Sequence, residues 1–171
     1  MRRYKRLRDE VLKADAEDPT HSYNLQSLKY LDAVVREGLR MGMSTPTRIP
    51  RVVPEQGWIF NGHHLPGGTQ VGCQPYTLHF NPAVFPEPFA FKPERWLDSP
   101  TAEMHRDWIA FSLGSRACLA RNLAQTELLL AIRAVAREGI LEGATALGED
   151  IEIHEWFNSA LEGGKLELIW S

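Results

Sequence analysis

Apolar residues recur with the spacing of an α-helix in three stretches of the chain, at about 2–14, 27–42 and 119–138. In each stretch they return every three or four residues, which places them on one face of a helix. The apolar positions are Tyr4, Leu7 and Val11 in the first stretch, Leu28, Leu31, Val35 and Leu39 in the second, and Ala120, Ala124, Leu128, Ile132 and Ala136 in the third. The pattern therefore predicts three helices, and Asp18-Pro19-Thr20 ends the first.

The third predicted helix is apolar around most of its circumference. Further apolar residues lie beside its main row, at Leu123, Leu130, Ala131 and Val135. A helix with only a narrow polar stripe is normally buried, and Gly139 is a suitable residue to end it. The sequence thus predicts a long buried helix, with Cys118 at its N-terminal end.

The middle of the chain excludes long helices, because ten of its eleven prolines lie between Pro46 and Pro100. Asn61-Gly62 separates two short segments, Gly-Trp-Ile-Phe at 57–60 and His-His-Leu-Pro at 63–66. This dipeptide tolerates two positive φ angles, so a tight hairpin is predicted. A third strand is predicted at 69–73, followed by an irregular Pro- and Phe-rich segment at 81–98. His63 and His64 would project to opposite faces of their strand and are expected on the surface.

Two further strand patterns close the chain, at 151–153 and 166–170, on either side of Glu162-Gly163-Gly164-Lys165. This arrangement predicts a terminal hairpin. Neither an internal repeat nor a low-complexity segment interrupts the order of elements. The fold class predicted is mainly α with small β hairpins (α+β), in a single domain over residues 1–171.

Composition narrows the classes of function. The net charge of −3 gives no reason to expect nucleic-acid binding. Cys73 and Cys118 lie far apart in the sequence and form no Cys-x-x-Cys pair, so neither a zinc site nor a disulfide framework is predicted. The sequence contains neither the long apolar run of a membrane span nor the apolar core of a signal peptide.

Cys118 is the strongest candidate for chemistry. The unpaired N–H groups and the positive dipole end of a helix N-terminus stabilise a thiolate, which is the form that binds a metal. Gly114 allows an unusual backbone conformation or the close approach of a flat ligand, and Arg116 supplies a fork of donors suited to a carboxylate. The alternative is that Cys118 is a small buried hydrophobic residue, which is the more common role of an isolated cysteine.

The order Phe111-x-x-Gly114-x-Arg116-x-Cys118-x-Ala120 resembles the haem-ligand loop of the cytochromes P-450, the haem-thiolate monooxygenases. The family has Gly at the last position, where this chain has Ala120. Glu37-Gly38-Leu39-Arg40 is similar to the family's Glu-x-x-Arg helix motif. By the residue pattern alone, Glu37 and Arg40 are a surface ion pair pointing away from the apolar stripe, whereas the resemblance implies a buried network completed by Arg95 of Pro93-Glu94-Arg95-Trp96.

The resemblance also implies a cofactor site. Cys118 would be the axial ligand of the iron of haem b, with Phe111 and Gly114 beside it. Arg116 would hold a haem propionate together with Arg51, for which Arg48 is the alternative. Residues facing the substrate are expected after the Glu-x-x-Arg helix, at Thr45, Thr47 and Ile49, and near the terminal turn, at Phe157, Asn158 and Ser159.

The function implied is insertion of one oxygen atom from dioxygen into an apolar organic substrate, with electrons from an NADPH-dependent reductase or another donor. The chain lacks the family's oxygen-activating Ala/Gly-Gly-x-Asp/Glu-Thr motif. We therefore expect it to be the C-terminal part of the fold, a fragment or truncated product that is inactive alone. A full-length eukaryotic form would be placed at the endoplasmic reticulum membrane, facing the cytosol, with membrane contact through its N-terminal part. The alternatives are a haem-binding module without oxygenation and an interaction module that has lost haem.

Overall fold

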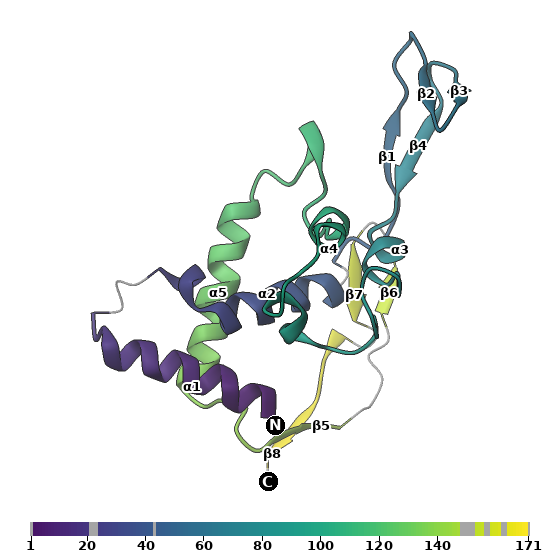
Figure 1. Cartoon of the computed structure of the whole chain (residues 1–171). Coiled ribbons are helices and arrows are strands. Elements are labelled where there is room, and N and C mark those ends of the chain that lie inside the picture. Colours follow the sequence, from purple (N-terminus) through teal and green to yellow (C-terminus); the bar gives the residue numbers. More distant parts are fainter. Residues whose placement is uncertain are drawn as a thin grey trace.

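The protein consists of a helical body, a projecting β ribbon and two short pairs of C-terminal strands in its computed structural model (Figure 1). The structure describes residues 2–20, 24–42, 44–147, 153–155, 158–161 and 164–170. The helical elements are α1 (Arg2–Glu17), η1 (Leu25–Ser27), α2 (Lys29–Gly42), α3 (Pro75–His79), η2 (Pro93–Trp96), α4 (Ala102–Asp107), η3 (Gly114–Arg116) and α5 (Arg121–Arg137). The strands are β1 (Ile49–Val52), β2 (Trp58–Phe60), β3 (His63–Leu65), β4 (Gln70–Cys73), β5 (Ala144–Ala146), β6 (Ile153–Glu155), β7 (Ser159–Leu161) and β8 (Leu168–Trp170).

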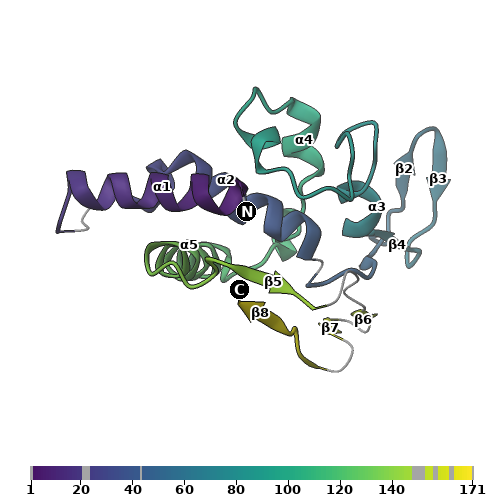
Figure 2. The ribbon, with the colours of Figure 1, turned by 90° about the horizontal axis from the view of Figure 1, so that it is seen from below.

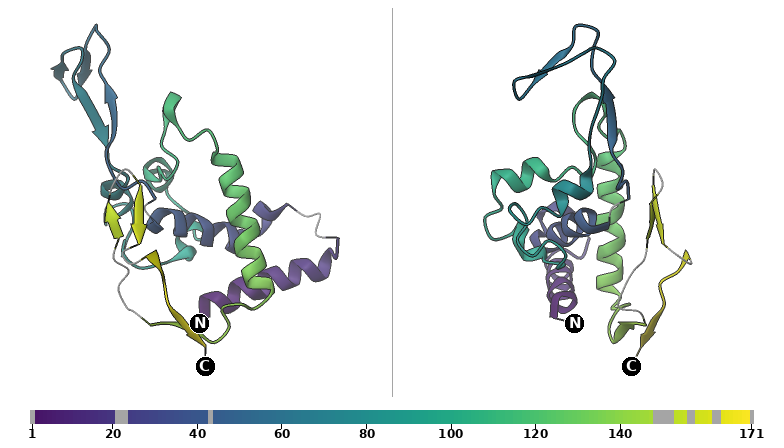
Figure 3. Two further views of the ribbon diagram at one scale, coloured as in Figure 1. Left: turned by 180° about the vertical axis from the view of Figure 1, so that it is seen from behind. Right: turned by 90° about the vertical axis from the view of Figure 1, so that its right-hand side faces the viewer.

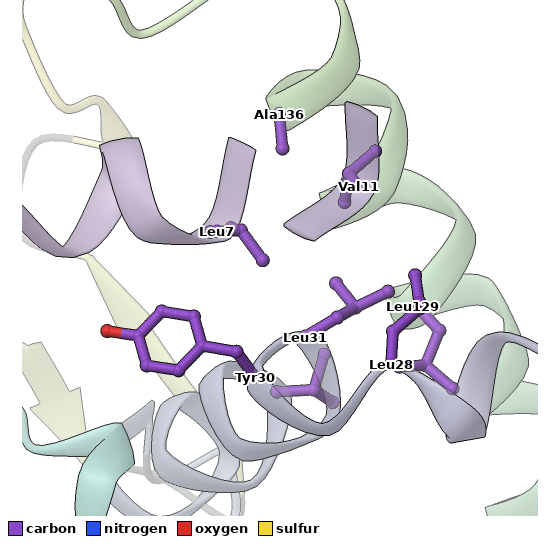
Figure 4. Close-up of a cluster of buried hydrophobic side chains, with 8 residues drawn as sticks. Leu7, Val11, Leu28, Tyr30, Leu31, Leu129 and Ala136 are labelled. Atoms are coloured by element: carbon purple, nitrogen blue, oxygen red, sulfur yellow. The ribbon is translucent and has the colours of Figure 1, made fainter. Parts of the chain in front are cut away.

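The main core lies where α1, α2 and α5 meet (Figure 4). Its buried members are Leu7, Val11, Leu28, Tyr30, Leu31, Val35, Leu129 and Ala136. Most of the apolar positions predicted for the first two helices therefore face this core. A second cluster joins α2 to the irregular segment and α4 through Ala33, Phe85, Trp96 and Met104. These two clusters hold α2 at the centre of the body.

The start of α2 is fixed by a side chain of α1. Glu10 accepts hydrogen bonds from the backbone N–H groups of Tyr30 and Leu31, each at 2.9 Å. These N–H groups lie in the first turn of α2, where the helix itself offers no acceptor. Glu10 thus caps α2 from a neighbouring helix, and α2 begins at Lys29, two residues later than the sequence pattern indicates.

The prediction that α5 is buried around most of its circumference is wrong. Leu129 and Ala136 are buried, but Leu123 is 62% exposed and Leu130 is 50% exposed. The reason is that α1, α2 and η1 pack against α5, and Figure 2 shows that α1 and α2 lie on the same side of it. The opposite side of α5 is an exposed apolar face in the part of the chain that the structure describes.

The β ribbon consists of two antiparallel pairs that extend beyond the helices (Figure 3). At its base β1 pairs with β4, with Ile49 opposite Cys73. At its tip β2 pairs with β3, and the predicted Asn-Gly turn joins them with φ angles of 50° at Asn61 and 81° at Gly62. The predicted third strand is β4, which therefore pairs across the ribbon with the strand that follows α2.

The C-terminal strands pair differently from the predicted terminal hairpin. β8 pairs with β5, next to the end of α5 (Figure 2), and β6 pairs with the nearer β7. A short connection favours pairing between sequence neighbours, which leaves β8 for β5. Residues 151 and 152 of the predicted first strand lie outside the described residues. Among the helices that the structure describes, no helix combines the length and the apolar character that crossing a membrane requires.

Candidate functional site

The loop between α4 and α5 presents Cys118 at the surface. The backbone N–H of Cys118 donates to the carbonyl oxygen of Phe111 at 2.8 Å, and that of Ala117 donates to Gly114 at 3.0 Å. Gly114 has a φ of +74°, the left-handed conformation that glycine adopts most readily. The loop is thus a closed turn in which a glycine-dependent bend precedes an exposed thiol.

Cys118 lies just ahead of α5 rather than inside it. The helix begins at Arg121, and Ala120 at its N-cap position provides no side-chain acceptor. The Cys118 carbonyl accepts a 3.4 Å hydrogen bond from the Arg121 N–H. Because the side chain is exposed, the alternative of a small buried hydrophobic residue is wrong.

A hollow of about 450 Å³ adjoins the Cys118 loop. It is lined from the loop side by Ile109, Ala110, Phe111, Ser112, Arg116 and Cys118, and from the other side by Leu39, Ser44, Thr45, Ile49, Pro50, Arg51, Pro75 and His79. Most of these side chains are apolar, and two carry guanidinium groups. The loop therefore shares one concave surface with the end of α2, the start of β1 and α3.

The arginines predicted to bind propionates differ in position. Arg51 and Arg116 both line the hollow, whereas Arg48 is exposed and is not among its lining residues. Arg51 donates from Nη1 to the Pro50 carbonyl at 2.9 Å and from Nη2 to Ser112 Oγ at 3.4 Å. The structure therefore brings Arg51 and Arg116 to one site and leaves Arg48 outside it.

Only some of the residues predicted to face the substrate line the hollow. Thr45 and Ile49 line the hollow, but Thr47 does not. Ser159 lies nearby, since its N–H donates to the carbonyl of Ser44, a lining residue, at 3.1 Å. Phe157 lies outside the described residues.

A second hollow, of about 790 Å³, lies between the β ribbon and the Cys118 loop. Ile49, Arg51, Ile109 and Ser112 line both hollows. The second hollow is walled by the aromatic side chains of Trp58 and Phe60 and contains the other free cysteine, Cys73. Cys73 is held in a strand, without a preceding glycine-dependent turn, and is a natural comparison for Cys118.

Glu37 and Arg40 form a buried network with Arg95, so the surface ion pair indicated by the residue pattern alone is wrong. Arg40 donates from Nε and Nη2 to the two Glu37 oxygens, both at 3.0 Å, and both side chains are 0% exposed. Arg95 Nε donates to Glu37 Oε1 at 3.1 Å. The network joins α2 to η2, and thus to the segment that leads into the Cys118 loop.

Two further donors to Glu37 were missed at the sequence level. Trp96 Nε1 donates to Glu37 Oε2 at 3.0 Å, and the Lys92 N–H donates to Oε1 at 2.9 Å. Burial raises the pKa of Glu37, but the hydrogen bonds from Arg40 and Lys92 and the charges of Arg40 and Arg95 outweigh burial and hold the pKa below its usual range. Glu37 is therefore a fully satisfied buried carboxylate.

His79 is a buried residue that the sequence patterns did not single out. It is 1% exposed, and its ring contacts Arg40 of α2 on one side and Ile109 of the Cys118 loop on the other. Burial, together with the charge of Arg40, lowers its pKa to about 4, although its hydrogen bond to the Arg40 backbone opposes the shift. No spacing rule could have found it, because its partners are backbone groups distant in sequence.

Comparisons with known proteins identify relatives of this chain. The family model described as cytochrome P-450 matches residues 3–138. The chain is 47% identical over 154 residues to the cytochrome P-450 monooxygenase mfmF of Annulohypoxylon moriforme, a match that covers 85% of this chain. It is 37% identical over 149 residues to the N-acetyltryptophan 6-hydroxylase ivoC of Emericella nidulans, again covering 85% of this chain.

A solved structure shares the fold. The crystal structure of the cytochrome P-450 CYP102L1 superposes on 99% of this chain with a TM-score of 0.71 at 23% identity, and the match covers 38% of that protein. The chain spans 31% of the length of mfmF and 29% of the length of ivoC. These relatives are therefore about three times as long as the chain described here.

Proposed function

Since the chain belongs to the cytochrome P-450 family, we propose that it is the haem-ligating portion of a monooxygenase, with Cys118 as the axial ligand of the iron. The observation that carries this proposal is the exposed Cys118 thiol at a mostly apolar hollow that also receives two guanidinium groups. Haem of the thiolate-ligated class takes a cysteine sulfur on one face of the iron, and it also needs apolar surroundings for its ring and cations for its propionates.

The residues present fit haem. The hollow offers Cys118 as a sulfur donor and Arg51 and Arg116 as charge partners, and its walls are largely apolar. At Gly114 the backbone takes the left-handed conformation, and a Cβ added there would meet no atom within 4 Å. The requirement for glycine at this position is therefore conformational rather than steric, since it sets the turn that leads to the thiol.

Each part of the chain has a distinct task in this account. Cys118 would hold the iron, and Arg51 and Arg116 would hold the haem carboxylates through charge-assisted hydrogen bonds. Phe111 packs edge-on against Trp108, with ring centroids 6.1 Å apart, and presents an apolar surface beside the thiol. The buried Glu37 network keeps α2 and η2 in fixed positions behind the loop. When bound, thiolate-ligated haem supplies the activation of dioxygen for insertion of one oxygen atom into an organic substrate.

The reaction partners follow from the family. We assign an NADPH-dependent reductase or another donor as the source of electrons and an apolar organic substrate, with Thr45 and Ile49 on its side of the hollow. Hydroxylation, named for the relative ivoC, is the reaction class that we assign to the full-length protein. We place that protein at the endoplasmic reticulum membrane, on its cytosolic side, with membrane contact through a part outside this chain.

Titration of the chain with haem tests the proposal. One haem should bind per chain, and haem at one hundred times its Kd should stabilise the fold by about 2.7 kcal/mol, measured as a rise in melting temperature. Arg137→Gln serves as the control and should bind haem as the wild type does, because Arg137 is an exposed residue of α5 that does not line the hollow. An unchanged melting temperature with no saturable binding would instead support an interaction module that has lost haem.

A further inference from the structure

His79 joins two segments that meet behind the Cys118 loop. Its Nδ1 lies 3.0 Å from the carbonyl oxygen of Arg40, near the end of α2. Its Nε2 accepts a hydrogen bond from the backbone N–H of Ile109 at 2.9 Å. In return, Arg40 Nη1 donates to the His79 carbonyl oxygen at 2.8 Å. The imidazole is thus a buried bridge between the Glu37–Arg40 helix and the segment that leads to Cys118.

The bridge requires one form of the ring. The Ile109 N–H can only donate, so Nε2 must carry a lone pair, and the Arg40 carbonyl can only accept, so Nδ1 must carry the proton. This is a neutral tautomer. A second proton would place an N–H of the ring against the N–H of Ile109. The lowered pKa of His79, about 4, agrees with this requirement.

Ile109 forms the first backbone hydrogen bond of the Cys118 loop. Its carbonyl oxygen accepts a hydrogen bond from the N–H of Ser112 at 2.9 Å. The neighbouring Phe111 carbonyl accepts the 2.8 Å hydrogen bond from the N–H of Cys118. A displacement of Ile109 would therefore also displace Cys118, because these two hydrogen bonds connect them. His79, Ile109 and Cys118 also line the same hollow, so the bridge lies beside the proposed haem site.

We propose that His79 is a positioning residue, which fixes the start of the Cys118 loop on α2 through the Ile109 N–H and so sets where the thiolate is presented. The inference rests on the proposed role of Cys118 as the iron ligand. His79 does not touch the thiol; it acts through the backbone between Ile109 and Cys118. A residue that only filled the core would contribute equally through any side chain of similar size.

Two variants separate the two ends of the bridge. In His79→Asn the amide lies at the position of Nδ1, so it keeps a donor for the Arg40 carbonyl and loses the acceptor for the Ile109 N–H. In His79→Gln the amide reaches the position of Nε2, so it keeps that acceptor and loses the donor to Arg40. If the bridge positions the loop, the two variants will loosen different segments.

Hydrogen exchange of the haem-free 171-residue chain, resolved by segment, gives the readout. In His79→Asn, amides in 109–118 should exchange about tenfold faster than in the wild type, as expected for loss of one hydrogen bond, while 29–38 is unchanged. In His79→Gln, 109–118 should match the wild type and the last turn of α2 should exchange faster. The proposal is overturned if neither variant changes 109–118, if both change it equally, or if neither variant folds. If only His79→Asn fails to fold, exchange of 109–118 at the wild-type rate in His79→Gln supports the proposal.

The haem-bound chain provides an independent spectroscopic arm. His79→Asn should lower the fraction of bound haem that gives the thiolate-type Soret band of the ferrous carbonyl complex, and His79→Gln should restore it. If the wild type gives no such band, the proposed function fails while hydrogen exchange still decides the role of His79. If the wild type gives the band and both variants match it in band and exchange, the positioning role fails and the proposed function stands.

Discussion

Arg40 donates from Nε and Nη2 to the two carboxylate oxygens of Glu37, both at 3.0 Å, and neither side chain has any exposed surface. An ion pair three residues apart on a helix usually lies at the surface and contributes little. Here Arg95 and Trp96 of η2 and the backbone N–H of Lys92 also donate to Glu37. The pair therefore joins α2 to η2. Removal of either Glu37 or Arg40 would leave the other as a buried charge without its partner.

Neutralising this carboxylate should be costly. We expect Glu37→Gln to lower the free energy of unfolding by about 3 to 5 kcal/mol, since Arg40 and Arg95 would lose their shared counter-charge in a buried site. Urea unfolding of the haem-free chain measures the change.

The same helix provides the matched control. Asp32 pairs with Arg36 at 2.7 Å, four residues apart, and both side chains are about one-third exposed. Asp32→Asn should therefore cost only about 0.2 to 0.5 kcal/mol. Equal losses in the two variants would show that the Glu37 network has no special structural role.

Acid should destabilise the chain through His79. Its folded-state pKa of about 4 lies below the ordinary value of 6.5, so the unfolded chain binds this proton more readily. The contribution is fully present above about pH 6.5 and is lost as the pH falls towards 4. Between about pH 7.5 and pH 5, wild type should lose roughly 2 kcal/mol more than His79→Gln, which cannot titrate there. Unfolding curves at a series of pH values provide the measurement, and parallel losses in the two proteins would contradict it.

Glu10 should contribute more to the stability of the fold than its place on α1 indicates. Its two oxygens accept the N–H groups of Tyr30 and Leu31 at the start of α2. We expect Glu10→Ala to cost about 1 to 2 kcal/mol, as loss of a helix cap does, with thermal unfolding as the measurement. Glu17→Ala, at the exposed end of the same helix, should stay within about 0.5 kcal/mol of the wild type. A loss no larger for Glu10 than for Glu17 would rule out capping.

Local patterns in the sequence anticipated the elements whose causes are local. The three helices follow from their apolar rows, and the hairpin at Asn61-Gly62 follows from the tolerance of that dipeptide for positive φ. The resemblance also picked out Glu37, Arg40 and Arg95, which the structure brings together. Burial of Glu37 could not be derived from its helix alone, because its other donors come from residues 92–96.

Features that depend on distant partners were missed or wrong. The exposure of Leu123 and Leu130 depends on which elements cover α5, and periodicity does not carry that information. The pairing of β8 with β5 depends on where α5 ends relative to the last strand. His79 escaped notice because both of its ring contacts are to backbone groups about 30 to 39 residues away. Such contacts leave no mark in residue spacing.

Arg51 and Arg48 should differ in their effect on haem affinity. Arg51 lines the hollow beside Cys118 and Arg48 does not. We expect Arg51→Gln to weaken haem binding by about tenfold to a hundredfold, the range for losing a hydrogen bond to a charged group. Arg48→Gln, a loss of the same charge three residues away, should change the Kd by less than about twofold. Spectroscopic titration measures both, and a larger effect at Arg48 would reassign the propionate contact.

The sulfur-to-iron bond is tested most directly by the ferrous carbonyl spectrum of the haem-reconstituted chain. The wild type should give the thiolate-type Soret band, Cys118→Ser should lose it, and Cys73→Ser should keep it, since Cys73 is the free cysteine of the second hollow. A band that is absent in the wild type, that persists in Cys118→Ser or that disappears in Cys73→Ser would contradict the assignment of Cys118 as the ligand.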